Sequence, residues 1–437
     1  MVRRVARRRT SITFRSRALG RRRTDATFGL AVAICVAACG GETGGSASHA
    51  VRDSAGIEIV ESTAPRWTEA EAWRIADAPE VSIGVADGDE PYLLSDVRGA
   101  RRLPDGRIAV LDAGSSRVRI YASDGTHLTD IAGPGAGPGE LQRPQFLGLV
   151  ADTFVVYEFL PGSLSWFGPD GSFIRRADTP RLPGGEFIRA MMFGLLDGSY
   201  QVGRGVPLDR EEGFEEGLNR APMPLWGFDV RDAELDSLGL VPGFEEVIDF
   251  PRENAIRHTH HLFGKTGWVT ASADRIFSGD DSDYSVKILD RTGATRRIIR
   301  KLVDPIPTTE SDRDRYIRQR IELEGVAGGE SRAYEEAFRG VTMADHMPAY
   351  RFLQADTEGN LWVEEWEGVG LGQGPFSVFD ADGAWLGSLD LPDGLPAGRG
   401  QLYLPWMEIG SDYLLGVWVD DLGIEQVRLY RIEKPEG

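Results

Sequence analysis

The chain has 437 residues, of which 27% are charged, and its formal net charge is -19 at pH 7. This acidic balance excludes a general nucleic-acid binder, because phosphate backbones are held by basic surfaces. The length exceeds what one compact core usually fills, but repeat architectures avoid that limit because each unit packs only on its neighbours. No nucleic-acid partner is therefore expected, and length alone leaves the number of domains open.

Residues 1–38 have the composition of a targeting segment. They contain ten arginines, no lysine and one acidic residue, and they end in an apolar run at 28–38. A basic segment followed by a short apolar run is typical of a signal peptide. Because about 20 apolar residues are needed to cross a bilayer as a helix, the run predicts a removable signal and not a permanent span.

The end of that run, VAACG at 36–40, resembles the lipobox of bacterial lipoproteins. The resemblance implies that Cys39 is acylated and becomes the first residue of the mature chain, with the lipid bilayer as its partner. A plain secretory signal is the alternative. The implied address is the cell envelope, facing the periplasm, and the absence of aspartate at Gly40 and Gly41 favours the outer membrane by the same resemblance.

Residues 39–54 predict a flexible tether, because glycine, serine and other small residues dominate their first half. The two cysteines of the chain are Cys35 and Cys39, and cleavage would discard the first. No disulfide is therefore expected within the mature chain.

Residues 97–131 show a repeated unit most clearly. Four alternating apolar runs are separated by the turns PDG, AGSS and SDG, which predicts a four-stranded antiparallel meander. Similar units follow at 145–177, 188–240, 258–301, 349–390 and 405–432. The turn between the third and fourth runs places Gly125, Gly171, Gly293 and Gly383 in equivalent positions.

Six units predict an all-β fold, a six-bladed β-propeller over 55–437. The last unit has three runs, so we expect 56–62, GIEIVES, to supply its missing strand beside Leu429 and close the ring. Tryptophans inside the units are expected to pack between blades; they are Trp166, Trp226, Trp268, Trp362 and Trp418.

The stretches AGIEIVES, GARRLPDGRIAVLDAGSSRVRIYASDG and GPGAGPGELQRP resemble bacterial six-bladed β-propeller proteins related to NHL repeats. The match covers most of 55–432 and is strongest over 95–144. The glycine- and proline-rich joint at 133–144 would then carry the chain from the first blade to the second. As a phosphate-binding loop it lacks both a lysine and a following helix pattern.

The segment 302–347 departs from the repeat. It is rich in charged residues and alanine, with Thr308 or Ser311 able to cap a helix and apolar residues at 317, 321, 334 and 338. These features predict a helical insertion at about 308–340, between the fourth and fifth blades.

Three of the six histidines lie in RHTHHLF at 257–263. In a strand His258 and His260 point to the same side and could bind one metal, although structural histidines are the simpler interpretation. The related lactonases imply calcium at the channel mouth, yet among the expected inner-strand starts only Glu408 supplies a carboxylate. No cofactor is predicted; calcium or zinc would be required by a hydrolase.

The expected starts of the inner strands instead suggest a cationic and aromatic channel mouth that would suit an anionic or sugar-like ligand. Its residues are Arg98, Arg189, His258, Tyr350 and Trp406. The sequence thus predicts a lipid-anchored envelope protein with a propeller that binds a ligand or scaffolds an envelope protein, and assigns no catalytic residue. The alternative is a propeller hydrolase or lactonase with a metal in the channel.

Overall fold

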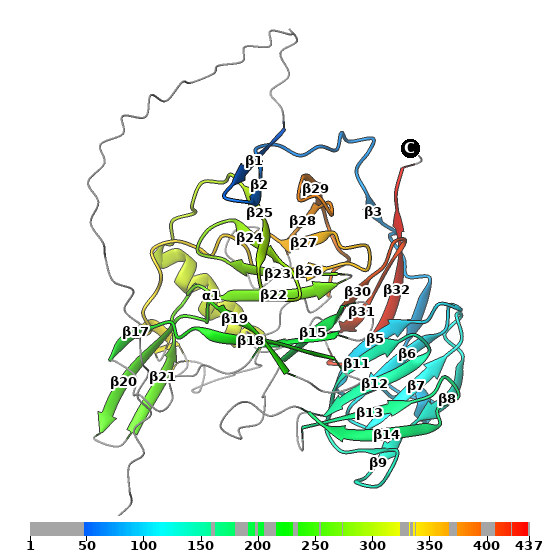
Figure 1. Ribbon diagram of the computed structural model, residues 1–437. Helices are drawn as coiled ribbons and strands as arrows, with labels where there is room; N and C mark the ends of the chain where they lie inside the picture. Colours follow the sequence, from blue (N-terminus) through cyan, green and yellow to red (C-terminus); the bar gives the residue numbers. More distant parts are fainter. Residues whose placement is uncertain are drawn as a thin grey trace, which may run out of the picture. The chain divides into compact units, whose positions relative to one another are not determined.

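The computed structural model of the chain describes residues 48–158, 162–179, 191–196, 200–204, 216–229, 235–252, 255–272, 274–323, 338–366, 374–394, 407–420 and 422–435, together with 332, 335 and 336. Ala47–Gly437 forms one compact unit. Strands dominate this unit, arranged as many small antiparallel sheets (Figure 1). Within these residues, no helix combines the length and apolarity needed to cross a membrane.

Six sheets, here called sheets 1 to 6, follow one another along the chain. Each has its strands in chain order, joined by antiparallel pairs, as the repeat predicted. Sheet 1 contains β5 (Val97–Arg102), β6 (Ile108–Asp112), β7 (Arg117–Tyr121) and β8 (His127–Ile131); sheet 2 contains β11 (Pro144–Val150), β12 (Thr153–Glu158), β13 (Ser163–Phe167) and β14 (Phe173–Asp178).

The later sheets keep this order. Sheet 3 contains β15 (Met191–Leu196), β16 (Tyr200–Arg204), β18 (Met223–Asp229) and β19 (Leu235–Val241); sheet 4 contains β22 (Gly267–Ser272), β23 (Arg275–Asp280), β24 (Ser285–Leu289) and β25 (Thr295–Lys301). Sheet 5 contains β26 (Phe352–Ala355), β27 (Leu361–Glu364), β28 (Phe376–Phe379) and β29 (Trp385–Leu389); sheet 6 contains β30 (Met407–Ile409), β31 (Tyr413–Val419) and β32 (Glu425–Glu433).

The four equivalent turn glycines are confirmed. Gly125, Gly171, Gly293 and Gly383 all have a positive φ, between 79° and 87°, and each lies between the third and fourth strands of its sheet. A side chain at any of them would press against a strand of the preceding sheet, namely β4 (Val81–Ile83), β8, β19 or β25; at Gly171, for example, a Cβ would lie 3.1 Å from Ile131 of β8. Glycine therefore permits both the turn and the close approach of consecutive sheets.

The hydrophobic core is divided into clusters, each shared by consecutive sheets. Leu111 and Leu147 represent the cluster between sheets 1 and 2, and Trp362 and Trp418 belong to the one between sheets 5 and 6. Further clusters join sheets 2 and 3, 3 and 4, and 4 and 5. A last cluster joins sheet 6 back to sheet 1. This succession is consistent with a propeller-like fold, in which radial sheets pack face to face.

The expected closing strand occupies another place. β2 (Ile57–Ser62) pairs in parallel with β25 of sheet 4 and in antiparallel with β1 (His49–Ser54), which lies within the residues expected to be tether. Sheet 6 is completed instead by β4 (Val81–Ile83), whose Val81 pairs with Leu429, and by β3 (Arg74–Ile75). The prediction that 56–62 adds to sheet 6 was therefore wrong. Both segments alternate apolar residues, and this pattern does not select the partner.

A separate sheet lies outside the six. β17 (Gly217–Asn219), β20 (Glu246–Arg252) and β21 (Ala255–His260) form it. Sheet 4 consequently begins at Gly267 and not at His258, which corrects the expected start of the fourth unit. Period-two alternation identified a strand at 255–260 but could not assign it to a sheet.

The helix α1 (Glu310–Leu323) lies between sheets 4 and 5 in the chain. Its cap is Thr309 and not Thr308 or Ser311: the Thr309 hydroxyl accepts the backbone N–H of Asp312, and the Asp312 carboxylate accepts the N–H of Thr309 at 2.7 Å. Such reciprocal bonds form a capping box, here with aspartate in the third position. Ile317 of the helix is buried, as its apolar spacing predicted.

The joint at 133–144 connects sheets 1 and 2, as expected. Two short parallel strands, β9 (Gly133–Pro134) and β10 (Glu140–Leu141), hold its ends together, and the Glu140 carboxylate accepts the N–H of Gly137 at 2.7 Å. The backbone N–H of Gly137, which a phosphate-binding loop would offer to a phosphate, is therefore already bound by the carboxylate of Glu140.

Candidate functional site

One end of the sheets carries a series of buried carboxylates. The first strand of a sheet begins beside the end of the second, as in the pairs of Val97 with Asp112 and Phe352 with Glu364. Asp112, Glu158 and Glu364 each end a second strand, and each is almost fully buried. The predicted mouth residues were expected at this same end, where first strands start.

Each of these carboxylates is held by an arginine and by backbone N–H groups. Asp112 contacts the buried Arg119 at 3.0 Å. Glu158 contacts Arg176 at 3.0 Å and accepts the N–H of Gln142 at 2.6 Å. Buried charges are tolerated when paired and hydrogen-bonded in this way. We therefore assign these groups to fixing the loops between strands, a role that the recurring acid at the strand end could have indicated.

The structure describes three of the five predicted mouth residues, and each lies in a different part of the fold. Arg98 forms an ion pair with Asp96 at 2.6 Å, and Tyr350 is fully buried in the cluster between sheets 4 and 5. His258 lies on β21, outside the six sheets. Arg189 and Trp406 lie outside the described residues, as does Cys39.

The two candidate metal-binding histidines lie on β21, where His260 is opposite Glu246 and His258 is opposite Ile248. His258 Nδ1 lies 2.8 Å from Glu246 Oε2, so this imidazole already has a carboxylate partner. In the part of the chain that the structure describes, no group of three or more histidine, cysteine, aspartate or glutamate residues has the arrangement of a metal site. The metal site at His258 and His260 therefore stays a prediction from the sequence.

Glu408, the carboxylate near the start of sheet 6, is also engaged. Its side chain accepts the hydroxyl of Tyr413 at 2.8 Å and the backbone N–H of Arg102 at 2.9 Å. It lies 3.5 Å from the guanidinium of Arg101. These bonds join sheet 6 to sheet 1, so Glu408 contributes to the contact between the sheets.

Perturbed titratable groups concentrate where sheets 4 and 5 meet. The N–H of Ala349 binds the carbonyl oxygen of Asp281 at 2.7 Å, and the N–H of Arg351 binds that of Glu364 at 2.8 Å. Burial raises the pKa of Asp281 to about 7. Burial also raises the pKa of Glu364 to about 7, against the opposing effect of Arg351. Two carboxyls that exchange protons near neutral pH therefore flank one short segment.

The pKa values of two basic groups beside this junction are lowered, so burial favours the neutral form of these groups as it does for the two carboxyls. Burial lowers the pKa of Lys265, whose ammonium donates to the carbonyl oxygen of His346 at 2.7 Å. Burial likewise lowers the pKa of His261, whose ring contacts the hydroxyl of Thr342 at 2.7 Å. Shifted pKa values of this kind gather at functional sites, but they also occur in structural networks.

An aromatic cluster joins the α1 segment to the residues that precede sheet 4. Phe263 packs edge-on against Tyr316 of α1, with ring centroids 5.7 Å apart, and against Trp366 at 6.3 Å. Leu262 and Met347 complete its buried part. Phe263 has a φ of 55°, which is strained for a bulky residue. This strain persists where surrounding packing fixes the backbone, so the cluster is a firm attachment of α1.

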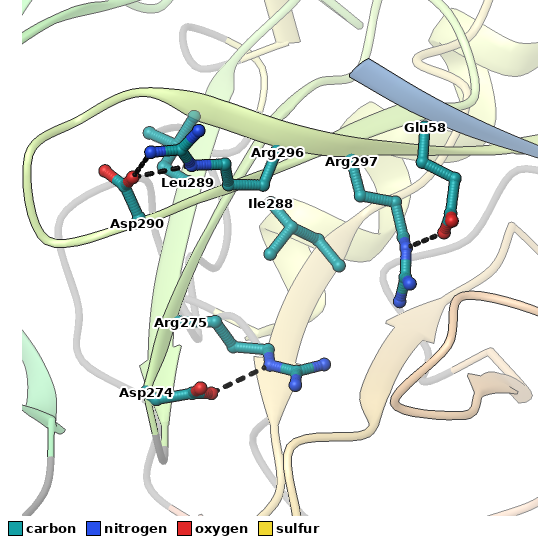
Figure 2. Close-up of a pocket in the computed structure, with 8 residues that line it drawn as sticks. All are labelled: Glu58, Asp274, Arg275, Ile288, Leu289, Asp290, Arg296 and Arg297. Carbon is teal, nitrogen blue, oxygen red and sulfur yellow. Dashed lines mark hydrogen bonds and ion pairs between the residues drawn. The ribbon is translucent and has the colours of Figure 1, made fainter. Parts of the chain in front are cut away.

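A pocket of about 280 Å³ lies at the opposite end of sheet 4 (Figure 2). Three arginines line it, and each faces a carboxylate: Arg296 with Asp290 at 2.6 Å, Arg297 with Glu58 at 2.5 Å, and Arg275 with Asp274 at 3.1 Å. Arg275 and Arg297 also donate to the carbonyl oxygen of Ala381 in sheet 5. The pocket therefore joins β2, sheet 4 and sheet 5, and its cations are engaged by the protein itself.

Comparisons with known proteins find distant structural similarity. No family model and no curated protein matches the chain. Among solved structures, a candidate exported protein from Bacteroides fragilis is 12% identical, with 86% of this chain and 100% of that chain covered and a TM-score of 0.47. A DUF4221 family member from Bacteroides vulgatus is 11% identical, with 84% and 100% covered and a TM-score of 0.48.

A gluconolactonase from Xanthomonas campestris is also similar, at 11% identity. The alignment covers 77% of this chain and 86% of that chain, with a TM-score of 0.39. At these values the comparisons give no argument about function, which must come from the residues of this chain.

Proposed function

We propose that this chain is an exported, lipid-anchored, six-bladed β-propeller that acts as a binding or scaffolding module of the cell envelope. The number of blades is supported by the six sheets and by core clusters that connect each sheet to the next and sheet 6 to sheet 1. The anchor is supported by the residues around Cys39.

The observation that carries the binding role is a pair of elements added to sheet 4. One is the separate sheet β17–β20–β21, which precedes β22 in the chain, and the other is the segment 302–347 with α1, which follows β25. Leu262, just after β21, forms a β-bridge with Met343 and so connects the two elements. Leu218 of β17 and Phe250 of β20 are 56% and 42% exposed. Protein-binding surfaces are marked by exposed apolar side chains that form a contiguous patch, and we propose that these two contribute to one. We assign the partner contact to this addition.

The binding role is tested by site-specific photocrosslinking in the native host. A photoreactive phenylalanine analogue at Phe250 is expected to give adducts of defined mass, because its side chain would lie against the partner. The same analogue at Leu422, an exposed residue in the β31–β32 turn, is the matched control. Adducts at neither position, or equally at both, would remove the support for this surface.

The anchor is tested separately. Metabolic labelling with a fatty-acid analogue should mark the full chain, and Cys39→Ala should abolish the label, because the thiol of Cys39 is the proposed attachment point. Mass measurement of the N-terminal peptide should show cleavage before Cys39. Labelling that survives the substitution would contradict the lipoprotein assignment.

A hydrolase with calcium or zinc in the channel is the alternative derived from the sequence. It requires stoichiometric metal in the purified protein, which elemental analysis measures. The ligand expected from Arg98 and Arg189 stays a prediction of its own, since Arg189 lies outside the described residues.

A further inference from the structure

An exposed apolar segment lies where the chain enters the folded unit. Residues 302–307, LVDPIP, are all exposed, and Leu302, Val303 and Ile306 expose 59%, 46% and 51% of their surface. Val51 of β1 is 57% exposed. Single exposed apolar residues are ordinary, but three large ones within five residues are not.

The segment lies next to the β1–β2 hairpin, at the end of the hairpin where Ser48 lies. The carbonyl oxygen of Ser48 accepts the N–H of Thr63 at 3.0 Å, and that of the preceding residue, Ser62, accepts the N–H of Leu302 at 3.0 Å. The β1–β2 hairpin thus brings the beginning of the unit beside residues 302–307. Figure 1 shows this hairpin in blue, beside β25.

The length of chain before Ser48 limits how far this segment can lie from the anchor. The nine residue-to-residue steps from Cys39 to Ser48 span at most about 32 Å when fully extended. If Cys39 is acylated, as proposed above, Ser48 must therefore stay within that distance of the membrane surface, and Leu302 lies one strand pairing away from it.

The segment is held in place rather than loosely attached. Leu302 donates to Ser62 at one end, and the carbonyl oxygen of Ile306 accepts the N–H of Met347 at 2.8 Å at the other. Pro305 and Pro307 fix φ and remove two backbone donors that would otherwise need partners. The apolar side chains are consequently presented by a short, restrained backbone.

The charges nearby do not favour an anionic surface. Arg300 pairs with Glu61 at 3.2 Å, and Arg52 pairs with the same carboxylate at 3.3 Å. Asp304 adds a negative charge within the segment, and the whole chain is acidic. Attachment to lipid must therefore come from apolar burial and not from attraction to acidic headgroups.

We propose that Leu302, Val303 and Ile306 form a membrane-docking loop that inserts into the interface of the bilayer to which Cys39 is anchored. The inference rests on the proposed lipidation. Insertion of the three side chains beside the anchor would convert a flexible attachment into a fixed orientation, with the β1–β2 edge of sheet 4 facing the membrane.

The test uses the full chain, processed and purified from a host that acylates lipoproteins, and reconstituted into phosphatidylcholine vesicles. Val303→Cys is labelled with an environment-sensitive fluorophore, and Leu422→Cys, which is 84% exposed at the wild-type residue, is the matched control. Interfacial helices bury apolar groups about 5–10 Å deep, so we expect a blue shift and about twofold stronger quenching by shallow spin-labelled lipids at 303 than at 422.

The outcomes separate the two proposals. A free thiol at Cys39 in the N-terminal peptide means that the lipid anchor, and not the loop, has failed. With Cys39 acylated, equal quenching at 303 and 422 overturns the docking loop. Quenching that appears only when phosphatidylglycerol is added also overturns it, because that result indicates electrostatic attachment.

A second variant guards against an effect of the label. A fluorophore at Val51→Cys should also show a blue shift on the vesicles if the loop holds this edge at the membrane. The triple variant Leu302→Ser/Val303→Ser/Ile306→Ser should then lose that shift. The three sites are exposed, so folding should be unaffected, which thermal unfolding checks. An unchanged signal at position 51 would contradict the proposed orientation.

Discussion

The two N-terminal attachments, β4 on sheet 6 and β2 on sheet 4, use similar sequences for different physical purposes. β4 is three residues long, yet Val81 and Ile83 are buried in the cluster between sheets 6 and 1. β2 is twice as long, but it lies on the outer side of sheet 4, where it is bound by its ladder and by ion pairs. The shorter strand closes the core, and the longer one joins the β1–β2 hairpin to sheet 4.

This difference teaches that strand length does not measure contribution to stability. Val81 and Ile83 of β4 belong to the core cluster shared by sheets 6 and 1, whereas Ile59 and Val60 of β2 are buried at the outer side of sheet 4 without belonging to any of the core clusters described above. Burial in a cluster shared by two sheets removes more apolar surface from water. We therefore expect substitutions at β4 to destabilise the fold more than matched substitutions at β2.

The largest effect is expected for Ile83→Ala, which should lower the free energy of unfolding by about 3–5 kcal/mol, because Ile83 is 1% exposed and its cavity would open between two sheets. Ile59→Ala of β2, at a residue 6% exposed, is the matched change and should cost about 2 kcal/mol. Denaturant unfolding followed by tryptophan fluorescence measures both. Equal losses would break the comparison.

The sequence could predict the sheets because their turns carry a local signal. Asp290 shows the reason: its carboxylate accepts the N–H groups of Thr292 and Ala294, and Gly293 between them takes the positive φ. Such turns are specified by a few adjacent residues, so their pattern is readable without a partner strand.

Partner choice could not be predicted in the same way. Val81 and Ile59 both stand in short alternating runs, and the choice of sheet depends on contacts made by residues hundreds of positions later. The same limit misplaced His258, whose strand forms a separate sheet. The buried acids Asp112, Glu158 and Glu364 were visible as strand-terminal residues, but their arginine partners lie at a different spacing in each sheet.

The second prediction concerns the turn that rests on β4. Gly125 has a φ of 87°, and an added Cβ would lie 3.1 Å from Val81 and 3.4 Å from Ile83. Gly125→Ala should therefore cost about 2 kcal/mol, since it combines a left-handed conformation with crowding of the closing strand. Gly423, in the turn between β31 and β32 of sheet 6, has a φ of 79° with no atom within 4 Å of an added Cβ.

Gly423→Ala is thus the control for the backbone term alone, and it should cost about 1 kcal/mol. The difference between the melting temperatures of the two variants measures the steric crowding of β4 by the added methyl group. If the two variants melt together, the closing strand is less tightly packed than the comparison requires.

The third prediction uses pH at the seam that β4 closes. Burial raises the pKa of Glu425, which accepts the N–H of Val97 at 2.8 Å. The folded state therefore binds this proton more tightly than the unfolded state. Its contribution to stability is present below the ordinary pKa of 4.5 and is lost as pH rises through the raised value.

Glu425→Gln should remove that loss. The variant and the wild type are compared by thermal melting from pH 4 upward, and the difference in stability should shift in favour of the variant as pH rises, by at most about 1.4 kcal/mol per pH unit. A difference that does not depend on pH would show that the carboxyl titrates normally at this seam.

The smallest effect is expected at β2, and it has the opposite sign. Hydrogen bonds from Arg52 and then Arg300 lower the pKa of Glu61. The contribution of this carboxylate is therefore present above the ordinary pKa of 4.5 and is lost as pH falls through the lowered value. Because the pairs are partly exposed, Glu61→Gln should cost no more than about 1 kcal/mol at pH 7.

Salt distinguishes this attachment from the closing strand. Raising the ionic strength to about 1 M shortens the Debye length to about 3 Å, so the cost of Glu61→Gln should shrink while the cost of Ile83→Ala should not. Unfolding of both variants in low and high salt gives the comparison directly. If the Glu61→Gln cost is unchanged by salt, β2 is held by its ladder and its buried face, and the ionic contrast between the two attachments no longer stands.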